Sequence, residues 1–244
     1  MKPIPLRFVR STLLAAALFV APCRGAEATP SADWSEAMAA FAREDAARPS
    51  PPGAVLFVGS SSIQLWSTLA ADFPGMPVIN RGFGGSHIAD SVYHFERLVS
   101  PHRPRLVVFY AGTNDLAAGK TPEAVAGDFR AFCNELHAAR PEARIIFISI
   151  QLSPARWQLR DKFALANTYI AAFCAADPRR RLLDTNAAML TPDGQARPEF
   201  FQADQLHLSP AGYAMWCRLL APLLQYDTLR PHGSPDWLPP PSEP

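Results

Sequence analysis

The chain has 244 residues, of which 48% are hydrophobic and 18% are charged, and its formal net charge is +1. This is the composition of a globular protein with enough residues for one sizeable domain. Its only basic run is Arg179-Arg180-Arg181. Nucleic-acid binding needs a clustered basic face, so we expect no nucleic-acid partner.

Residues 1–28 have the pattern of a secretory signal peptide. Basic residues precede an apolar run at 11–21 that is too short to span a bilayer comfortably, and Ala26-Glu27-Ala28 offers a cleavage site. The competing interpretation is an uncleaved N-terminal anchor. We expect cleavage, no stable membrane insertion afterwards, and a secreted or periplasmic location.

Residues 29–226 are expected to form a single domain. A helix is expected over Asp33–Ala47, where apolar residues recur at helical spacing before a proline cluster. Short, continuous apolar runs predict strands at 54–58, 77–80, 105–110, 144–150 and 181–184. Helical patterns follow at 62–72, 87–99, 121–139, 160–176 and 209–225, and Thr121-Pro122 has the form of a capped helix start.

Strands that alternate with helices predict an α/β fold with a parallel sheet. Five strands fit a flavodoxin-like three-layer α/β/α sandwich, in which ligands bind beyond the carboxyl ends of the strands. The loops at 59–62, 81–86 and 111–116 should therefore lie together at one edge. The proline-rich tail, residues 227–244, is expected to wrap the surface or stay disordered.

Three cysteines remain after loss of the leader: Cys133, Cys174 and Cys217. An odd number without close spacing is not a disulfide framework, and buried, unpaired thiols are favoured. One disulfide in an oxidising compartment is the alternative. No Cys-x-x-Cys or His-x-x-x-His spacing occurs, so we expect no metal site and no cofactor.

The loop Gly59-Ser60-Ser61-Ser62 follows the first predicted strand and opens a helix. A glycine permits a tight turn there, and a serine on such a turn can act as a nucleophile. The alternative is that one of the serines simply caps the helix.

Two further loops carry candidate oxyanion donors. Residues 80–86 (NRGFGGS) let backbone approach a ligand closely, whereas their glycine spacing and their place after the second strand do not fit a dinucleotide-binding loop. In the third loop, Asn114 can donate its amide to a developing oxyanion or bond its own turn backbone. Asp115 is interpreted as a loop organiser.

Asp204 and His207 lie three positions apart near the C-terminus, so the carboxylate can orient the imidazole as a general base. Such a pair alone is common. Together with an early serine it completes the set of side chains that a nucleophilic hydrolase needs.

Four segments resemble, in order, the motif blocks of the SGNH hydrolases, also called the GDSL esterase/lipase family. They are residues 55–66 (VLFVGSSSIQLW), 80–86, 112–115 (GTND) and 204–213 (DQLHLSPAGY). The resemblance implies the SGNH hydrolase fold and the hydrolysis of carboxylic esters without a metal or cofactor.

The resemblance also implies a role for each matching residue. Ser61 would be the nucleophile, His207 the base and Asp204 the orienting acid. The oxyanion hole would consist of the Ser61 N–H, the Gly85 N–H and the Asn114 side chain. One departure is that Ser60 stands where the family has an aspartate, so Ser60 or Ser62 could be mistaken for the nucleophile.

The expected partner is a small-molecule or glycan ester, with short acyl chains favoured because no long apolar insertion suggests a lipid-binding lid. Arg81, His87 and Arg156 are candidate substrate contacts, and a structural role is the alternative for Arg81 and His87. The second functional class is a non-catalytic glycan- or lipid-binding protein that retains the fold.

Overall fold

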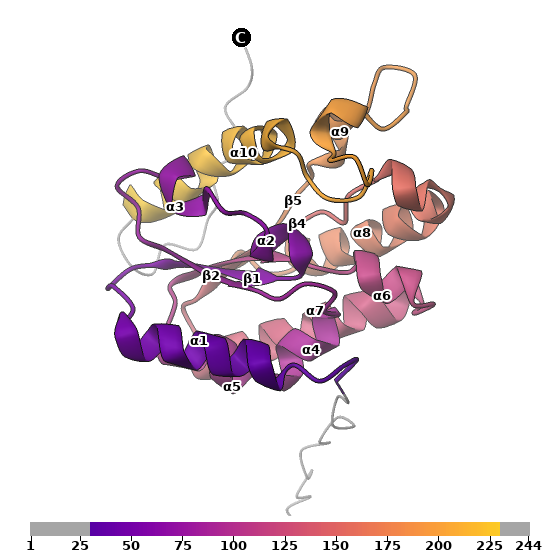
Figure 1. Cartoon of the computed structure of the whole chain (residues 1–244). Helices are drawn as coiled ribbons and strands as arrows, with labels where there is room; N and C mark the ends of the chain where they lie inside the picture. The colour runs from indigo at the N-terminus through magenta and orange to yellow at the C-terminus, as the bar shows by residue number, and fades with distance from the viewer. Residues whose placement is uncertain (1–29, 230–244) are drawn as a thin grey trace, which may run out of the picture.

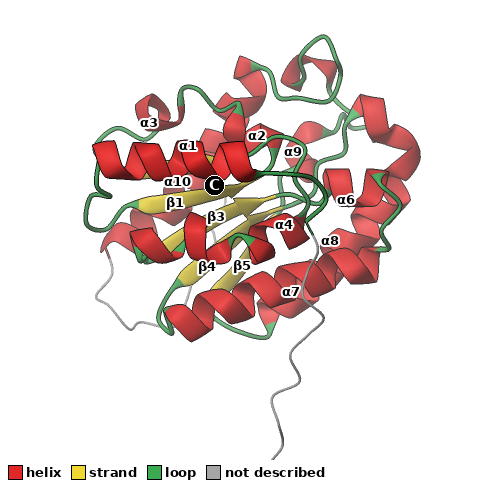
Figure 2. Ribbon diagram, turned by 60° about the horizontal axis from the view of Figure 1, so that its bottom comes forward, coloured by secondary structure: helices red, strands yellow, loops and turns green. Residues whose placement is uncertain are grey.

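A computed structural model describes residues 30–229 and contains a single five-stranded parallel sheet in the order β2-β1-β3-β4-β5. The strands are β1 (Val55–Gly59), β2 (Val78–Gly82), β3 (Leu106–Tyr110), β4 (Arg144–Ile148) and β5 (Arg180–Leu183). Figure 2 shows them running in the same direction between two layers of helices. The predicted flavodoxin-like sandwich is confirmed. The predicted signal peptide, and residues 230–244 of the predicted tail, lie outside the described residues.

Both faces of the sheet are buried, as the continuous apolar runs predict. Successive side chains of β1 point to opposite faces: Val55 and Phe57 enter one core cluster, and Leu56 and Val58 enter the other. Figure 1 shows α2, α3 and α10 above the sheet and α1, α4, α5 and α7 below it. Each layer of helices closes one of the two cores.

The long helices form where they were predicted, and α10 continues past its predicted end. They are α1 (Ser35–Ala47), α7 (Pro122–Ala139), α8 (Arg160–Ala175) and α10 (Pro210–Leu229). The Thr121 hydroxyl accepts a hydrogen bond from the Ala124 N–H at 3.2 Å, so the predicted cap of α7 is present. Within residues 30–229, no helix is both long enough and apolar enough to cross a bilayer.

Two predicted helices are each broken into two short ones. The pattern at 62–72 forms α2 (Ser61–Gln64) and α3 (Leu69–Asp72), and the pattern at 87–99 forms α4 (Ile88–Tyr93) and α5 (Phe95–Leu98). The first break lets the Trp66 ring enter the core, where it stacks on Tyr213 with centroids 5.1 Å apart. Tertiary packing therefore overrides the local helical pattern.

Several short elements were not predicted. They are α6 (Thr113–Ala117), α9 (Asn186–Met189) and the 3-10 helices η1 (Ser100–His102), η2 (Pro154–Leu159) and η3 (Pro198–Phe200). Such short helices show little hydrophobic periodicity. Three of them, α6, η2 and η3, lie in the loops that surround the site described below.

The predicted start of the tail at residue 227 is wrong. Helix α10 continues to Leu229, and Asp227 is buried at 3% exposure. Its carboxylate forms ion pairs with Arg105 at 3.0 Å and with Arg144 at 3.2 Å. These ion pairs attach the end of α10 to the segments where β3 and β4 begin. Cys133, Cys174 and Cys217 are all free thiols, the first two buried, so the predicted unpaired state is present.

Candidate active site

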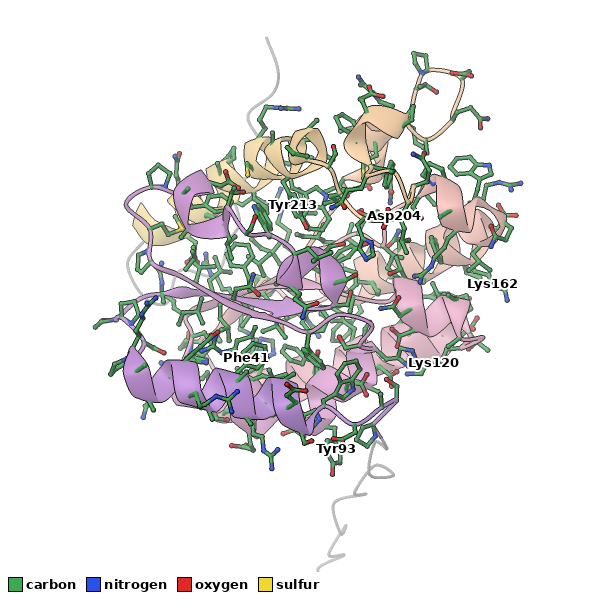
Figure 3. The ribbon with its side chains drawn as sticks, viewed as in Figure 1. Phe41, Tyr93, Lys120, Lys162, Asp204 and Tyr213 are labelled. Carbon is green, nitrogen blue, oxygen red and sulfur yellow. The ribbon has the colours of Figure 1, made fainter. Side chains whose placement is uncertain are left out.

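The polar loops predicted to carry chemistry meet at the carboxyl edge of the sheet. Glycines end β1 and β2, and α6 begins directly after β3. In Figure 3, Asp204 lies on the loop between α9 and α10, at the end of the sheet where α2 and α6 begin. Parallel strands place their carboxyl ends together, so segments far apart in sequence meet there.

The turn after β1 depends on close backbone packing. A Cβ at Gly59, where φ is +152°, would lie 1.9 Å from the Tyr110 carbonyl oxygen. A Cβ at Gly82 would lie 2.2 Å from the backbone nitrogen of Gln64, in α2. The Asn80 amide donates to the Ile63 carbonyl at 2.7 Å. Strands β2 and β3 thus hold both sides of the turn that presents the serines.

Of the three adjacent serines, Ser61 alone is partly exposed. Its Oγ lies 3.0 Å from His207 Nε2, 146 positions later in the chain. Ser60 and Ser62 are buried, and the Ser62 carbonyl accepts a hydrogen bond from the Tyr213 hydroxyl at 2.9 Å. The helix-cap interpretation is wrong for Ser60, because it precedes α2 but makes no side-chain cap bond.

Asp204 holds the imidazole from the other side. Its Oδ2 lies 2.6 Å from His207 Nδ1, and its Oδ1 accepts the backbone N–H groups of Leu206 and His207, each at 3.0 Å. Gln205 adopts φ +57°, which tightens the turn between the two side chains. The hydrogen bond from the His207 ring, followed by those backbone N–H groups, lowers the pKa of Asp204 to about 2. The carboxylate is therefore ionised at neutral pH.

Three neutral donors were predicted for an oxyanion hole. The backbone N–H groups of Ser61 and Gly85 donate to no other described residue. Gly85 adopts φ +87°, a conformation that side chains disfavour. The Asn114 amide donates to the Ser86 carbonyl at 3.2 Å and accepts from Arg156 at 3.0 Å. The alternative that Asn114 bonds its own turn backbone is therefore wrong.

Asp115 organises the loops, as predicted. It is fully buried and accepts the Ile88 N–H at 3.1 Å and the Lys120 ammonium at 3.1 Å. Burial raises its pKa, and the nearby Lys120 charge opposes that shift. The carboxylate thus ties the start of α4 to α6.

The three candidate substrate contacts have different surroundings in the structure. Arg81 is buried and forms ion pairs with Glu44, at 3.1 Å, and with Asp45 in α1. The prediction that Arg81 contacts substrate is corrected, because its guanidinium serves to attach α1 to β2. His87 precedes α4, and its N–H donates to Asp90 at 2.7 Å. Arg156 does lie at the site, bonded to Asn114.

The contacts that support the turn with Asp204 and His207 were not predicted. The Gln151 amide donates to the Leu206 carbonyl at 3.0 Å, and the Ala155 N–H donates to the Gln205 carbonyl at 3.1 Å. Both donors lie on the loop after β4. No local signal could reveal these contacts, since they join residues about fifty positions apart. Within residues 30–229, no group of three or more His, Cys, Asp or Glu is placed to hold a metal ion.

Comparison with known proteins identifies the family of the chain. The sequence model of the GDSL-like Lipase/Acylhydrolase family matches residues 57–215. The chain belongs to this family. It is therefore a hydrolase of the esterase/acylhydrolase type.

One curated relative is the platelet-activating factor acetylhydrolase IB subunit alpha1 of Pongo abelii. It is 32% identical over 181 residues, which are 70% of this chain and 74% of the relative. A GDSL-like lipase from Bacteroides thetaiotaomicron shares the fold, with a TM-score of 0.67, 22% identity and coverage of 78% of this chain and 97% of the other. So does an acetyl-xylooligosaccharide esterase from Geobacillus Stearmophilus, with a TM-score of 0.58, 16% identity and coverage of 75% and 98%.

Proposed function

We propose that the protein hydrolyses short-chain O-acyl esters, above all acetyl esters, with Ser61 as nucleophile, His207 as general base and Asp204 as orienting acid. The observation that carries this proposal is the continuous chain of contacts, from Ser61 Oγ to His207 Nε2 at 3.0 Å and from His207 Nδ1 to Asp204 Oδ2 at 2.6 Å. A base in contact with a hydroxyl and with an orienting carboxylate is the arrangement that activates a serine.

In the proposed reaction, Ser61 Oγ attacks the ester carbonyl carbon while His207 takes the hydroxyl proton. The Ser61 N–H, the Gly85 N–H and the Asn114 amide stabilise the tetrahedral oxyanion. The C–O bond to the alcohol then breaks as His207 protonates the leaving oxygen, which leaves an acyl-enzyme. Water attacks that ester with His207 again as base, and the carboxylic acid and free Ser61 are released.

The preference for acetyl groups rests on likeness to relatives. The curated relative is named as an acetylhydrolase, and one of the structural neighbours is named as an acetyl-xylooligosaccharide esterase. On this basis we propose acetyl groups on carbohydrate as the substrate class. A comparison of p-nitrophenyl acetate, butyrate and octanoate, together with acetylated xylo-oligosaccharides, tests the proposal. Faster turnover of octanoate than of acetate would contradict it.

We also propose that the protein is secreted or periplasmic, because residues 1–28 combine a basic start, an apolar run and an A-x-A site. N-terminal sequencing of protein expressed with residues 1–28 should yield a chain that begins near residue 29. Full-length protein retained in the cytoplasm would contradict export.

The catalytic proposal is tested with matched serine variants. Ser61→Ala should abolish hydrolysis of p-nitrophenyl acetate. Ser60→Ala, which removes a neighbouring hydroxyl that forms no hydrogen bond with any described residue, should retain most of it. If the wild-type protein binds glycans but hydrolyses no ester, it is a binding protein that retains the fold.

A further inference from the structure

The Asn114 side chain is held at both ends of its amide. Its Oδ1 accepts a hydrogen bond from Arg156 Nη2 at 3.0 Å, and its Nδ2 donates to the Ser86 carbonyl at 3.2 Å. A guanidinium can only donate and a carbonyl oxygen can only accept. The amide therefore cannot exchange its oxygen and nitrogen without losing both bonds. One N–H of Nδ2 is used by Ser86, and the second remains for an oxyanion.

The Arg156 guanidinium contacts this amide, and no carboxylate within residues 30–229 forms an ion pair with it. It is half-buried, its Nη1 is buried, and no hydrogen bond joins Nη1 to any residue of the described chain. Of the described ionisable groups, the Tyr110 hydroxyl, in β3, lies near enough to influence the pKa of Arg156. Burial raises the pKa of Tyr110 well above its usual range, so this neighbour is neutral. The guanidinium charge is thus available to polarise the amide that it contacts.

The loop after β4 fixes where the Arg156 side chain begins. Arg156 lies within η2 but has non-helical angles, φ −121° and ψ 24°. Its backbone N–H donates to the Ser153 carbonyl at 3.1 Å. The adjacent Ala155 N–H donates to the Gln205 carbonyl, in the turn that carries the base. The loop therefore contacts both the base-bearing turn and Asn114.

We propose that Arg156 is a positioning residue that acts through Asn114, orienting the amide and polarising its free N–H toward the oxyanion. A cationic donor on Oδ1 draws electron density from the amide and makes its N–H a stronger donor. The benefit appears where negative charge develops on the substrate oxygen, in the transition state. This inference rests on the proposed oxyanion role of Asn114.

A double-mutant cycle with p-nitrophenyl acetate tests the proposal. Removal of an oxyanion donor costs about 100-fold or more in kcat, and this is the loss expected for Asn114→Ala. Arg156→Gln should lower kcat by about 10-fold with KM nearly unchanged, as expected for an interaction made in the transition state. In the Asn114→Ala background, Arg156→Gln should change kcat by less than about 2-fold, because its target is absent.

An equal loss of kcat from Arg156→Gln in both backgrounds, or a loss confined to KM, would overturn the proposal in favour of direct substrate contact. Arg156→Lys keeps the charge but not the planar donor group, and it should fall between wild type and Arg156→Gln. Arg160→Gln, at an exposed arginine that begins α8, serves as the control with unchanged kcat. Full activity in Asn114→Ala would instead refute the oxyanion role, so failure of the two proposals can be told apart.

Discussion

Asp115, in α6, and Asp204, in the loop before α10, lie at the same edge of the sheet, yet their surroundings are opposite. The Asp115 side chain is completely buried and binds backbone and Lys120, whereas the Asp204 side chain is 47% exposed and faces the His207 ring. The loops that follow β1, β2 and β3 are therefore held by buried contacts. The turn that carries Asp204 and His207 lies at the surface and is positioned by hydrogen bonds.

The difference shows how a site can combine rigidity with access. Close glycine contacts and a buried carboxylate hold the proposed nucleophile and the proposed oxyanion donors, and solvent can still reach the His207 imidazole. Substitutions on the two sides should therefore fail in different ways. Those at the buried supporting residues Gly59 and Asp115 should reduce the free energy of unfolding, and those in the exposed turn should reduce turnover.

The largest effect is expected from Asp204→Asn. Loss of the orienting carboxylate should lower kcat by about 10,000-fold, because the imidazole is no longer held in the required tautomer. The free energy of unfolding should fall by no more than about 1 kcal/mol, since the side chain is 47% exposed and solvent screens its hydrogen bonds. Steady-state kinetics and urea unfolding measure the two quantities. A large loss of stability with activity retained would contradict the comparison between the buried loops and the exposed turn.

Gly59→Ala should have the largest effect on stability. The added Cβ would overlap the Tyr110 carbonyl in a buried turn, which should cost about 3 kcal/mol of unfolding free energy. Gly127→Ala is the matched control, because Gly127 is an exposed residue in α7 with open space around its Cβ position. That change should stabilise the protein by about 0.5–1 kcal/mol. Equal effects of the two changes in thermal unfolding would show that the turn after β1 is not tightly packed.

Asp115→Ala should cost about 2 kcal/mol of unfolding free energy, because the buried Ile88 N–H loses its acceptor. Asp115→Asn should cost less, since its side-chain oxygen can still accept that N–H. Urea unfolding at pH 7 separates the two variants. The interpretation of Asp115 as a loop organiser fails if Ala and Asn are equally well tolerated.

The smallest expected effect is on the pH dependence of stability, which should be opposite for Asp115 and Asp204. Burial raises the pKa of Asp115, so its contribution to stability is present at low pH and is lost as pH rises through the native pKa. The pKa of Asp204 is lowered to about 2, so its contribution is present above the unfolded value, about 3.9, and is lost as pH falls toward 2. Relative to wild type, Asp115→Asn should gain stability and Asp204→Asn should lose it as pH rises from 2.5 to about 5. If the unfolding free energies of the two variants, measured by chemical unfolding, changed with pH in the same direction relative to wild type, the different environments of Asp115 and Asp204 would be contradicted.

The sequence was sufficient to predict the order of strands and helices, because buried parallel strands and long amphipathic helices have strong local patterns. It was also sufficient to place Ser61 and Asn114 at one edge of the sheet, and the family resemblance added Asp204 and His207 to that site. It could not show that Arg81 binds α1, because a buried ion pair between distant segments leaves no spacing signal. The Arg156–Asn114 contact and the break at Trp66 likewise depend on tertiary packing.

The central claim is that Ser61, and neither of its neighbours, is the nucleophile. A fluorophosphonate probe followed by mass spectrometry of the labelled peptide tests this most directly. We predict an adduct on Ser61 that persists in Ser60→Ala, disappears in Ser61→Ala and forms far more slowly in His207→Ala. An adduct on Ser60 or Ser62, or no adduct on the wild-type protein, would contradict the account.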